Sequence, residues 1–249
     1  MVLLNELLAY CDDLLDVAAF HDYAPNGLQI EGAAEVRKVV SGVSACQALI
    51  DAAVAAGADA LLVHHGFFWK GESDCIVGIK RRRIAKLIEN NVSLIGYHLP
   101  LDGHPEVGNN AQLAKRLGIE IEGRFGQADL GMYGRLPKKM KAEELMALLV
   151  NVLGRRPLHL QGEVDDIERL AWCTGAAQSY IDATPQLGVQ AFISGEVSEQ
   201  TIHIVRETGV HYFAAGHHAT ERYGVQALGD VLAKIFSIEH EFIDIDNPV

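Results

Sequence analysis

Segments that are apolar throughout alternate with helix-like segments along this chain, and this alternation limits the fold more than any other feature. Runs of aliphatic residues predict strands at 39–43, 60–63 and 93–97, and apolar residues at helical spacing predict helices at 3–15, 45–56 and 79–90. A strand without a polar face must be covered on both sides, as in the parallel sheets built from βαβ units. The sequence therefore predicts an α/β fold.

Part of this pattern occurs twice. Residues 47–62 align without gaps on residues 178–193, with Gln, Ile, Asp, Ala, Gly and Ala shared at one constant offset. This agreement predicts two similar, interlinked α/β domains related by an internal repeat, residues 1–125 and residues 126–249. We expect a loop insertion near residues 66–83, and a join near residues 122–137, where glycine, proline and charged residues interrupt the pattern.

Composition excludes several classes of protein. With 249 residues, 49% of them hydrophobic, the chain can bury a sizeable core, and no apolar run approaches the roughly 18 residues that span a bilayer. A net charge of −12 opposes general binding to nucleic acid. The acidic N-terminal stretch does not resemble a signal peptide, and four cysteines without a CxxC pair suit a reducing compartment. We expect a cytoplasmic protein without membrane or nucleic-acid partners.

Histidines and carboxylates follow several predicted strands, where open α/β sheets place their ligands. His64 and His65 end one strand, and Asp102 follows the next strand along the chain. In the second half, His217 and Glu221 stand four residues apart at the start of a predicted helix, so they share one helix face. These five residues are the candidate metal ligands.

This set of side chains suits two metal ions. His64 and His65 point to opposite faces of a strand, so each would serve a different ion. A carboxylate can bridge two cations roughly 3.5–4 Å apart, and such a pair generates a hydroxide nucleophile near neutral pH. We therefore expect two divalent ions per subunit, and the ligands accommodate zinc, iron, manganese or nickel. The alternative is that the histidine pair is structural or faces solvent, and that the His/Glu pair is an ordinary helix surface feature.

Two further residues are candidates for catalysis. His98 lies close to Asp102 in sequence and can carry protons, serve as a further ligand or lie beside the ligands. Glu196 occupies the position equivalent to His65 in the aligned repeat. The remaining histidines considered are interpreted as surface or core residues: His104, His159, His203, His211 and His240.

Five motifs together resemble a known family. They are Asp22-Tyr23-Ala24-Pro25-Asn26-Gly27-Leu28-Gln29, Val63-His64-His65-Gly66, His98-Leu99-Pro100-Leu101-Asp102, Ser194-Gly195-Glu196 and Gly216-His217-His218-Ala219-Thr220-Glu221. In this combination, which covers essentially the whole chain, the sequence resembles the GTP cyclohydrolase I type 2 homologue family, also called Nif-three-like. The resemblance implies a toroidal homohexamer of two-domain subunits and a dinuclear metal site held by His64, His65, Asp102, His217 and Glu221.

Two positions depart from the pattern of many members of that family. Leu99-Pro100 stands where a small hydroxyl residue is common, and His218 replaces a single aromatic residue. Both positions lie near the expected site, and neither departure removes a ligand.

Three other features lie near the motifs, and the first two have two interpretations each. Phe67, Phe68 and Trp69 can stack on a purine or pterin ring, or can pack a subunit interface or cap the sheet. Residues 80–83 place four cations at a helix start, which indicates either an anionic neighbour or a solvated face. The backbone N–H groups at 174–175 and 194–195 can cradle a phosphate, although no P-loop or GxGxxG is present to support ATP or NAD binding.

These observations favour a metal-dependent hydrolase that acts on a nucleotide or a related heterocycle, with His98 or Glu196 moving protons. The alternatives are a non-enzymatic metal-binding ring that serves as a scaffold, and a metal-dependent oxidoreductase. A ring that encloses DNA is opposed by the net charge. The expected partners are further copies of the chain and a small-molecule substrate.

Overall fold

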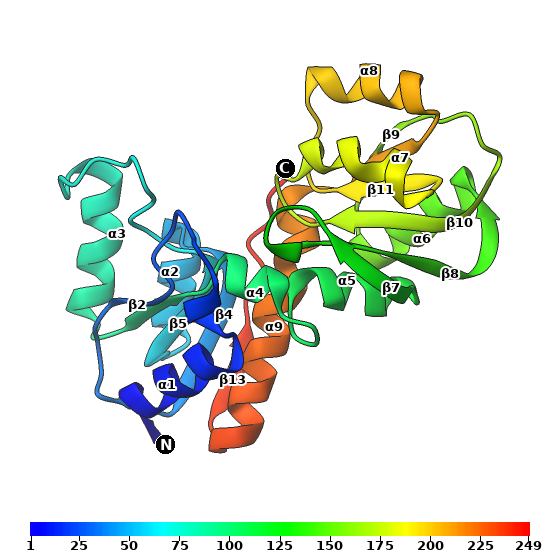
Figure 1. Cartoon of the computed structure of the whole chain (residues 1–249). Coiled ribbons are helices and arrows are strands. Elements are labelled where there is room, and N and C mark those ends of the chain that lie inside the picture. Colours follow the sequence, from blue (N-terminus) through cyan, green and yellow to red (C-terminus); the bar gives the residue numbers. More distant parts are fainter. The chain divides into compact units, whose positions relative to one another are not determined.

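The computed structural model describes residues 1–249, and they divide into two units (Figure 1). Unit 1 consists of Met1–Val107 and Gly224–Asp246, and unit 2 consists of Gly108–Tyr223 and Asn247–Val249. Each unit has its own central sheet, which contains a run of adjacent parallel strands and has helices packed against it. The predicted mixed α/β fold is confirmed. None of the helices combines the length and apolar character that crossing a bilayer requires.

Unit 1 is built on a five-stranded sheet in the order β13-β4-β5-β6-β2, in which only the β2 edge is antiparallel. Its elements are β1 (Val2–Leu3), α1 (Leu4–Leu14), η1 (Val17–Ala19), β2 (Gly27–Ile30), β3 (Glu35–Val36), β4 (Lys38–Ser44), α2 (Gln47–Ala55), β5 (Ala60–His65), α3 (Gly78–Glu89), β6 (Ser93–Gly96), α4 (Leu99–Gly103), the greater part of α9 (His217–Phe236) and β13 (Glu239–Phe242).

The central strand β5 is buried on both faces because helices cover each side of the sheet. Ala60 and Leu62 pack against α1 and α9, whereas Leu61 and Val63 pack against α2 and α3. This arrangement explains why the strand shows no polar alternation in the sequence. It also sends the two residues that end the strand, His64 and His65, off opposite faces.

Unit 2 is built on a six-stranded sheet in the order β7-β8-β10-β11-β12-β9, in which the three central strands are parallel to one another. Its elements are α5 (Asn109–Leu117), β7 (Glu120–Phe125), η2 (Gln127–Asp129), β8 (Gly131–Lys141), α6 (Ala142–Leu153), β9 (Leu158–Leu160), β10 (Asp166–Cys173), η3 (Gln178–Ala183), α7 (Thr184–Leu187), β11 (Ala191–Ser194), α8 (Glu199–Thr208), β12 (His211–Ala214) and the first residues of α9.

One face of this sheet carries the main core of unit 2. Trp172, Ile193 and Phe213 pack there against α5, α6 and the start of α9. The indole N–H of Trp172 donates to the carbonyl oxygen of Asn110 at 3.0 Å, so the buried ring leaves no polar atom unsatisfied. The start of α9 is therefore tied into the core of unit 2.

The division of the chain differs from the expected boundary at residues 125/126. The segment expected to join two domains, residues 122–137, lies mostly in β7 and β8, which pair as antiparallel strands of one sheet. At the other end of the chain, β13 pairs with β4, which returns residues 224–246 to unit 1. Pairing between strands that are distant in the sequence decided both differences. In residues 122–137, the glycine and charged residues of strands near a sheet edge have a composition similar to that of a linker.

The two aligned segments also differ in local structure. Residues 47–55 form the α-helix α2, whereas residues 178–183 form a 3₁₀-helix that is followed by the single-turn helix α7. Pro185 lies in the first turn of α7, where its missing N–H costs nothing. A continuous α-helix through 178–187 would instead place that proline in the interior, where it removes a hydrogen bond.

The core of unit 1 provides a direct test of this packing. Leu62→Ala removes a fully buried side chain from β5, and we expect it to lower the free energy of unfolding by about 2–5 kcal/mol. Ile88→Ala on the exposed side of α3 is the matched control and should change stability by less than about 0.5 kcal/mol. Urea denaturation of both variants measures the difference, and equal costs would contradict the assigned layers.

Candidate metal centre

Three imidazoles meet at the carboxyl ends of β5 and β6 in unit 1. The rings of His64 and His65 lie with their centroids 4.6 Å apart although the two residues leave opposite faces of β5. His98 follows β6, and its ring centroid is 5.1 Å from that of His64. The ligand atoms of His64, His65 and His98 all lie within 4.8 Å of one another, a spacing that can hold a metal ion.

The orientation of these rings is set through Nδ1. Nδ1 of His64 donates to the carbonyl oxygen of Tyr97 at 2.9 Å, and Nδ1 of His98 donates to Oδ1 of Asp22 at 2.9 Å. Both partners can only accept, so in a neutral ring the proton sits on Nδ1 and the lone pair on Nε2. Nδ1 of His65 is held at 2.9 Å by the Ser44 hydroxyl. Metal-binding histidines are typically oriented in this way.

Asp102 completes the group in unit 1. It lies on the short helix α4, where its backbone N–H donates to the carbonyl oxygen of His98. Its Oδ1 is 3.4 Å from Nε2 of His64, and both side chains are almost completely buried. A buried carboxylate next to the lone pair of an imidazole is a donor set that suits a divalent cation.

The Asp22–Gln29 motif has a structural role that the sequence alone did not reveal. Asp22 accepts from Nδ1 of His98 and from the N–H of Leu99, and Asn26 accepts from the N–H of His98. Burial opposes the ionisation of Asp22, but hydrogen bonds from His98, Asn26 and Leu99 hold the pKa of its carboxyl well below the usual range. Asp22 is therefore an ionised partner for His98.

Gln29, at the end of the same motif, fixes the loop that follows His65. Its Oε1 accepts from the N–H of Phe67 at 2.7 Å, and its Nε2 donates to the carbonyl oxygen of Pro25 at 2.9 Å. Gly66 and Gly96 pack directly against this side chain, and a Cβ at Gly66 would overlap it. The motif thus positions both His98 and the exit of β5.

The three aromatic side chains after His65 lie in three different environments. Phe67 is buried in the core, and Phe68 packs under Nζ of Lys80, which also pairs with Glu72. Trp69 alone lies against the histidines, with its ring centroid 5.0 Å from that of His98 in an edge-to-face arrangement. Lys80, in α3, therefore has neighbours on the loop that precedes this helix, and Trp69 is the residue of this segment that borders the candidate centre.

The two departures from the family pattern leave the local structure intact. Leu99 uses its backbone N–H to reach Oδ2 of Asp22 at 2.9 Å, a contact that any residue other than proline can make. Pro100 lies in the first turn of α4, where proline is tolerated. His218 is nearly buried in the first turn of α9, and its backbone N–H donates to a main-chain oxygen of Val249.

In unit 2, His217 and Glu221 stand one turn apart at the start of α9. Nε2 of His217 is 3.0 Å from Oε2 of Glu221, and Nδ1 of His217 is 2.7 Å from Oε1 of Glu196. Burial disfavours charge on this ring, yet hydrogen bonds and the charges of Glu221 and Glu196 raise the pKa of His217 to about 9. The electrostatic field that holds a proton at Nε2 equally favours a divalent cation there.

Two glycines make room for this pair. Gly175 has a φ of +69°, and a Cβ at that position would overlap Oε1 of Glu221. At Gly195 a Cβ would lie only 2.7 Å from the Cα of His217. The carboxylate and the imidazole therefore occupy a space that only glycine leaves open.

The expected phosphate cradle at 174–175 and 194–195 is absent, because protein groups already occupy the amides. Thr174 N–H donates to Oδ1 of Asn110, and Gly175 N–H donates to Oγ1 of Thr220. Gly195 N–H donates to the carbonyl oxygen of Gly175. These N–H groups are consumed in holding the loops together, so they are not available to a phosphate.

The other histidines have partners away from these groups. His104 accepts N–H groups of its own turn, His203 pairs with Glu199, and His240 lies between Ser41 and Asp230. His159 and His211 contact each other in unit 2. The structure thus brings together His64, His65, His98 and Asp102 in unit 1, and His217, Glu221 and Glu196 in unit 2.

With this geometry established, comparison with known proteins gives one result. A family model described as Duf34/NIF3 (NGG1p interacting factor 3) matches residues 2–248. The chain belongs to this family. The GTP cyclohydrolase 1 type 2 homolog of Pseudomonas aeruginosa is 54% identical over 250 residues, 99% of each chain, and that of Escherichia coli (strain K12) is 52% identical over 245 residues, 98% of each.

Solved structures of the family agree with the fold. The protein ybgI is 51% identical with a TM-score of 0.97, and TTHA1606 from Thermus thermophilus is 33% identical with a TM-score of 0.91; each comparison covers 100% of both chains. The expected membership in the GTP cyclohydrolase I type 2 homologue family is therefore confirmed. In this Duf34/NIF3 protein, the family motifs coincide with the residues that orient the histidines.

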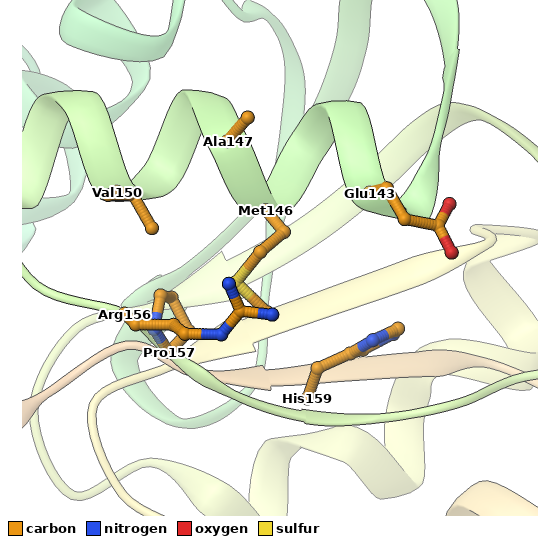
Figure 2. A pocket seen from close by; sticks show the side chains of 7 residues that line it. All are labelled: Glu143, Met146, Ala147, Val150, Arg156, Pro157 and His159. Atoms are coloured by element: carbon orange, nitrogen blue, oxygen red, sulfur yellow. The ribbon is translucent and has the colours of Figure 1, made fainter.

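Unit 2 also contains two cavities away from its core. One, of about 540 Å³, is bordered by Arg155, Glu196 and Gly216, and the other, of about 750 Å³, lies beside α6 and β9 (Figure 2). His159 borders the larger cavity and stacks on Phe213 with ring centroids 4.4 Å apart. Its Nε2 is 3.0 Å from Nδ1 of His211, which also accepts the N–H of Gly162.

This stacked histidine makes the stability of unit 2 depend on pH. Burial, together with the neighbouring His211, lowers the pKa of His159 below the 6.5 of a free imidazole. Below pH 6.5 the unfolded chain therefore binds a proton at this histidine more readily than the folded chain does. The contribution of neutral His159 to the free energy of unfolding is complete above that pH and is lost as the pH falls. His159→Phe keeps the stack and removes the titration.

We expect the free energy of unfolding to fall less between pH 7.5 and pH 5.5 in His159→Phe than in the wild type, as measured by urea denaturation. His203→Phe on the exposed face of α8 is the control and should follow the wild type. Parallel pH profiles for wild type and His159→Phe would contradict the assignment.

Proposed function

We propose that this Duf34/NIF3 protein holds two divalent metal ions through His64, His65 and Asp102 of unit 1 and His217 and Glu221 of unit 2. The observation that carries the proposal is the occupation of Nδ1 in the imidazoles, since His64, His98 and His217 each give that atom to a group that can only accept. In the neutral rings, Nε2 is therefore the ligand atom of His64 and His217, and it is the atom of His98 that can accept a proton.

The carboxylates support the same proposal. Asp102 faces Nε2 of His64 in unit 1, and Glu221 faces Nε2 of His217 in unit 2, so each unit presents an imidazole and a carboxylate together. A Cβ at position 175 would overlap Oε1 of Glu221, so the glycine at this position leaves space for the Glu221 side chain. Glu221 has two carboxylate oxygens, and we assign it as the ligand shared by both ions.

We infer hydrolysis as the reaction. When bound, a pair of divalent ions supplies Lewis-acid chemistry and allows water to react near neutral pH. The His98 imidazole, with ionised Asp22 on Nδ1, is suited to accept and return a proton at Nε2. Glu196 holds the ring of His217 through Nδ1, so we assign it as a positioning residue.

A nucleotide or a related heterocycle is the proposed substrate class. Trp69 and Tyr23 stand around His98, with ring centroids 5.7 Å apart, and present aromatic surface on which a planar base can stack. The curated relatives carry the name GTP cyclohydrolase 1 type 2 homolog, which agrees with a substrate of this kind.

The assembly proposed for the protein is a toroidal homohexamer of subunits whose two units descend from an internal repeat. Three adjacent parallel strands at the centre of each sheet, β4-β5-β6 and β10-β11-β12, support the repeat. All four cysteines are free thiols, which suits the cytoplasm as the location.

Metal analysis of purified variants tests the ligand set. Glu221→Ala should lose both ions if its carboxylate bridges them, and His64→Ala should lower the metal content because it removes a nitrogen ligand. His203→Ala, on the exposed face of α8, is the control and should keep the wild-type content. Loss of a single ion in Glu221→Ala would contradict the bridge, and wild-type protein that stays metal-free after reconstitution would contradict the centre.

Turnover distinguishes the hydrolase from a scaffold. The metal-loaded protein should hydrolyse at least one member of a nucleotide panel, and His98→Ala should lower the rate by about 10²- to 10⁴-fold, the usual contribution of a general acid–base residue, while metal content is retained. Product analysis by chromatography measures both. Full metal content without turnover on any nucleotide would favour the scaffold or redox alternatives.

A further inference from the structure

The smaller cavity of unit 2 lies directly beside the Glu196–His217 pair. It has a volume of about 540 Å³ and is bordered by Arg155, Arg156, Glu196, Gly216 and the segment Pro248–Val249. A space of this size is within the range that small-molecule sites occupy in proteins. The cavity shares Glu196 with the candidate metal centre, because Oε1 of this residue holds Nδ1 of His217.

Arg155 presents an unsatisfied donor at this cavity. Its Nη1 is shielded from water and has no hydrogen-bond acceptor, and no carboxylate forms an ion pair with its guanidinium. A buried guanidinium nitrogen without an acceptor is costly, so such groups require an explanation such as a ligand. The chain has a net charge of −12, and yet none of its 33 acidic side chains pairs with Arg155.

Two glycines, Gly154 and Gly216, allow the Arg155 guanidinium to lie at this cavity. Gly154 ends α6 in the left-handed conformation with φ of +71°, which turns the chain so that Arg155 leaves the helix. Gly216 has φ of +101°, and a Cβ there would overlap Nη1 of Arg155. The guanidinium therefore lies directly over the residue that precedes the ligand His217.

Two arginine side chains border the smaller cavity. Arg156 is exposed, makes no ion pair and borders both cavities of unit 2; Figure 2 shows its side chain extended beside Pro157 toward Met146. Glu196 is the single acidic side chain at the smaller cavity, and His217 already engages one of its oxygens. Two arginine side chains thus border this cavity, and Glu196 is the one acidic side chain beside them.

We propose that this cavity binds the phosphate group of the substrate, with Arg155 as its principal contact. The inference rests on the proposed function and narrows the substrate class to phosphorylated small molecules. The Arg155 guanidinium has no hydrogen-bond or ion-pair partner in the protein, and its planar fork matches the geometry of a phosphate group bound in the cavity. The phosphate group of the substrate would then lie beside Gly216. The reacting end of the substrate would lie toward His217 and Glu221.

Isothermal titration calorimetry of the protein as purified tests this inference, with GMP, guanosine and inorganic phosphate as probes. Arg155→Gln should weaken GMP binding by about ten- to hundred-fold, the range for losing hydrogen bonds to a charged group, and should leave the affinity for guanosine unchanged. Arg206→Gln, on the exposed part of α8 in the same unit, is the matched control and should bind GMP like the wild type.

Arg155→Lys covers the case in which the glutamine variant does not fold. It keeps the charge and loses the two-pronged contact, so a smaller decrease in GMP affinity is expected. Wild-type protein that binds GMP and guanosine equally would overturn the inference without any variant. Unchanged GMP affinity in Arg155→Gln would show that the phosphate binds elsewhere, and would overturn it as well.

Metal content separates this inference from the proposed function. Arg155→Gln should retain the wild-type amount of metal, because Arg155 contacts Gly216 and not a ligand side chain. Protein that lacks metal but binds GMP through Arg155 would refute the metal centre and support the phosphate site. Protein with full metal content and no dependence on Arg155 would refute the phosphate site alone.

Discussion

The arrangement of the candidate centre depends on how each imidazole is held through Nδ1. The carbonyl oxygen of Tyr97 fixes His64, the carboxylate of Asp22 fixes His98, and the carboxylate of Glu196 fixes His217. Because none of these groups can donate, the tautomer of the neutral ring is set and Nε2 becomes its basic atom. The strands and loops around the centre serve mainly to bring these acceptors to the correct positions.

The same requirement accounts for residues that do no chemistry themselves. Asn26 and Gln29 fix the loops on either side of the histidines through backbone contacts. Gly175 leaves space for the Glu221 carboxylate, and Gly216 leaves space for the guanidinium of Arg155. Their hydrogen bonds and close contacts show that residues without imidazole or carboxylate groups also shape this part of the protein.

Prediction from sequence succeeded where one strand or helix decides the outcome. The alternation of apolar strands with helices gave the α/β class, and β5 ends at His64 and His65 as expected. It failed where distant segments meet: residues 122–137 form paired strands, residues 224–246 return to unit 1, and the glycines expected to cradle phosphate use their N–H groups internally. Hydrogen-bond partners between segments far apart in the chain leave no periodic signal.

The sequence by itself determined the class of fold, the family and the identity of the chemical groups, because these depend on residue type and short spacing. Tertiary structure alone decided the tautomers of the histidines, the contact of Glu196 with Nδ1 of His217 and the isolation of Arg155. Each of these depends on which atom of a distant residue lies within about 3 Å, as with Asp22 and His98, 76 residues apart. Proximity of that kind is a property of the packed chain.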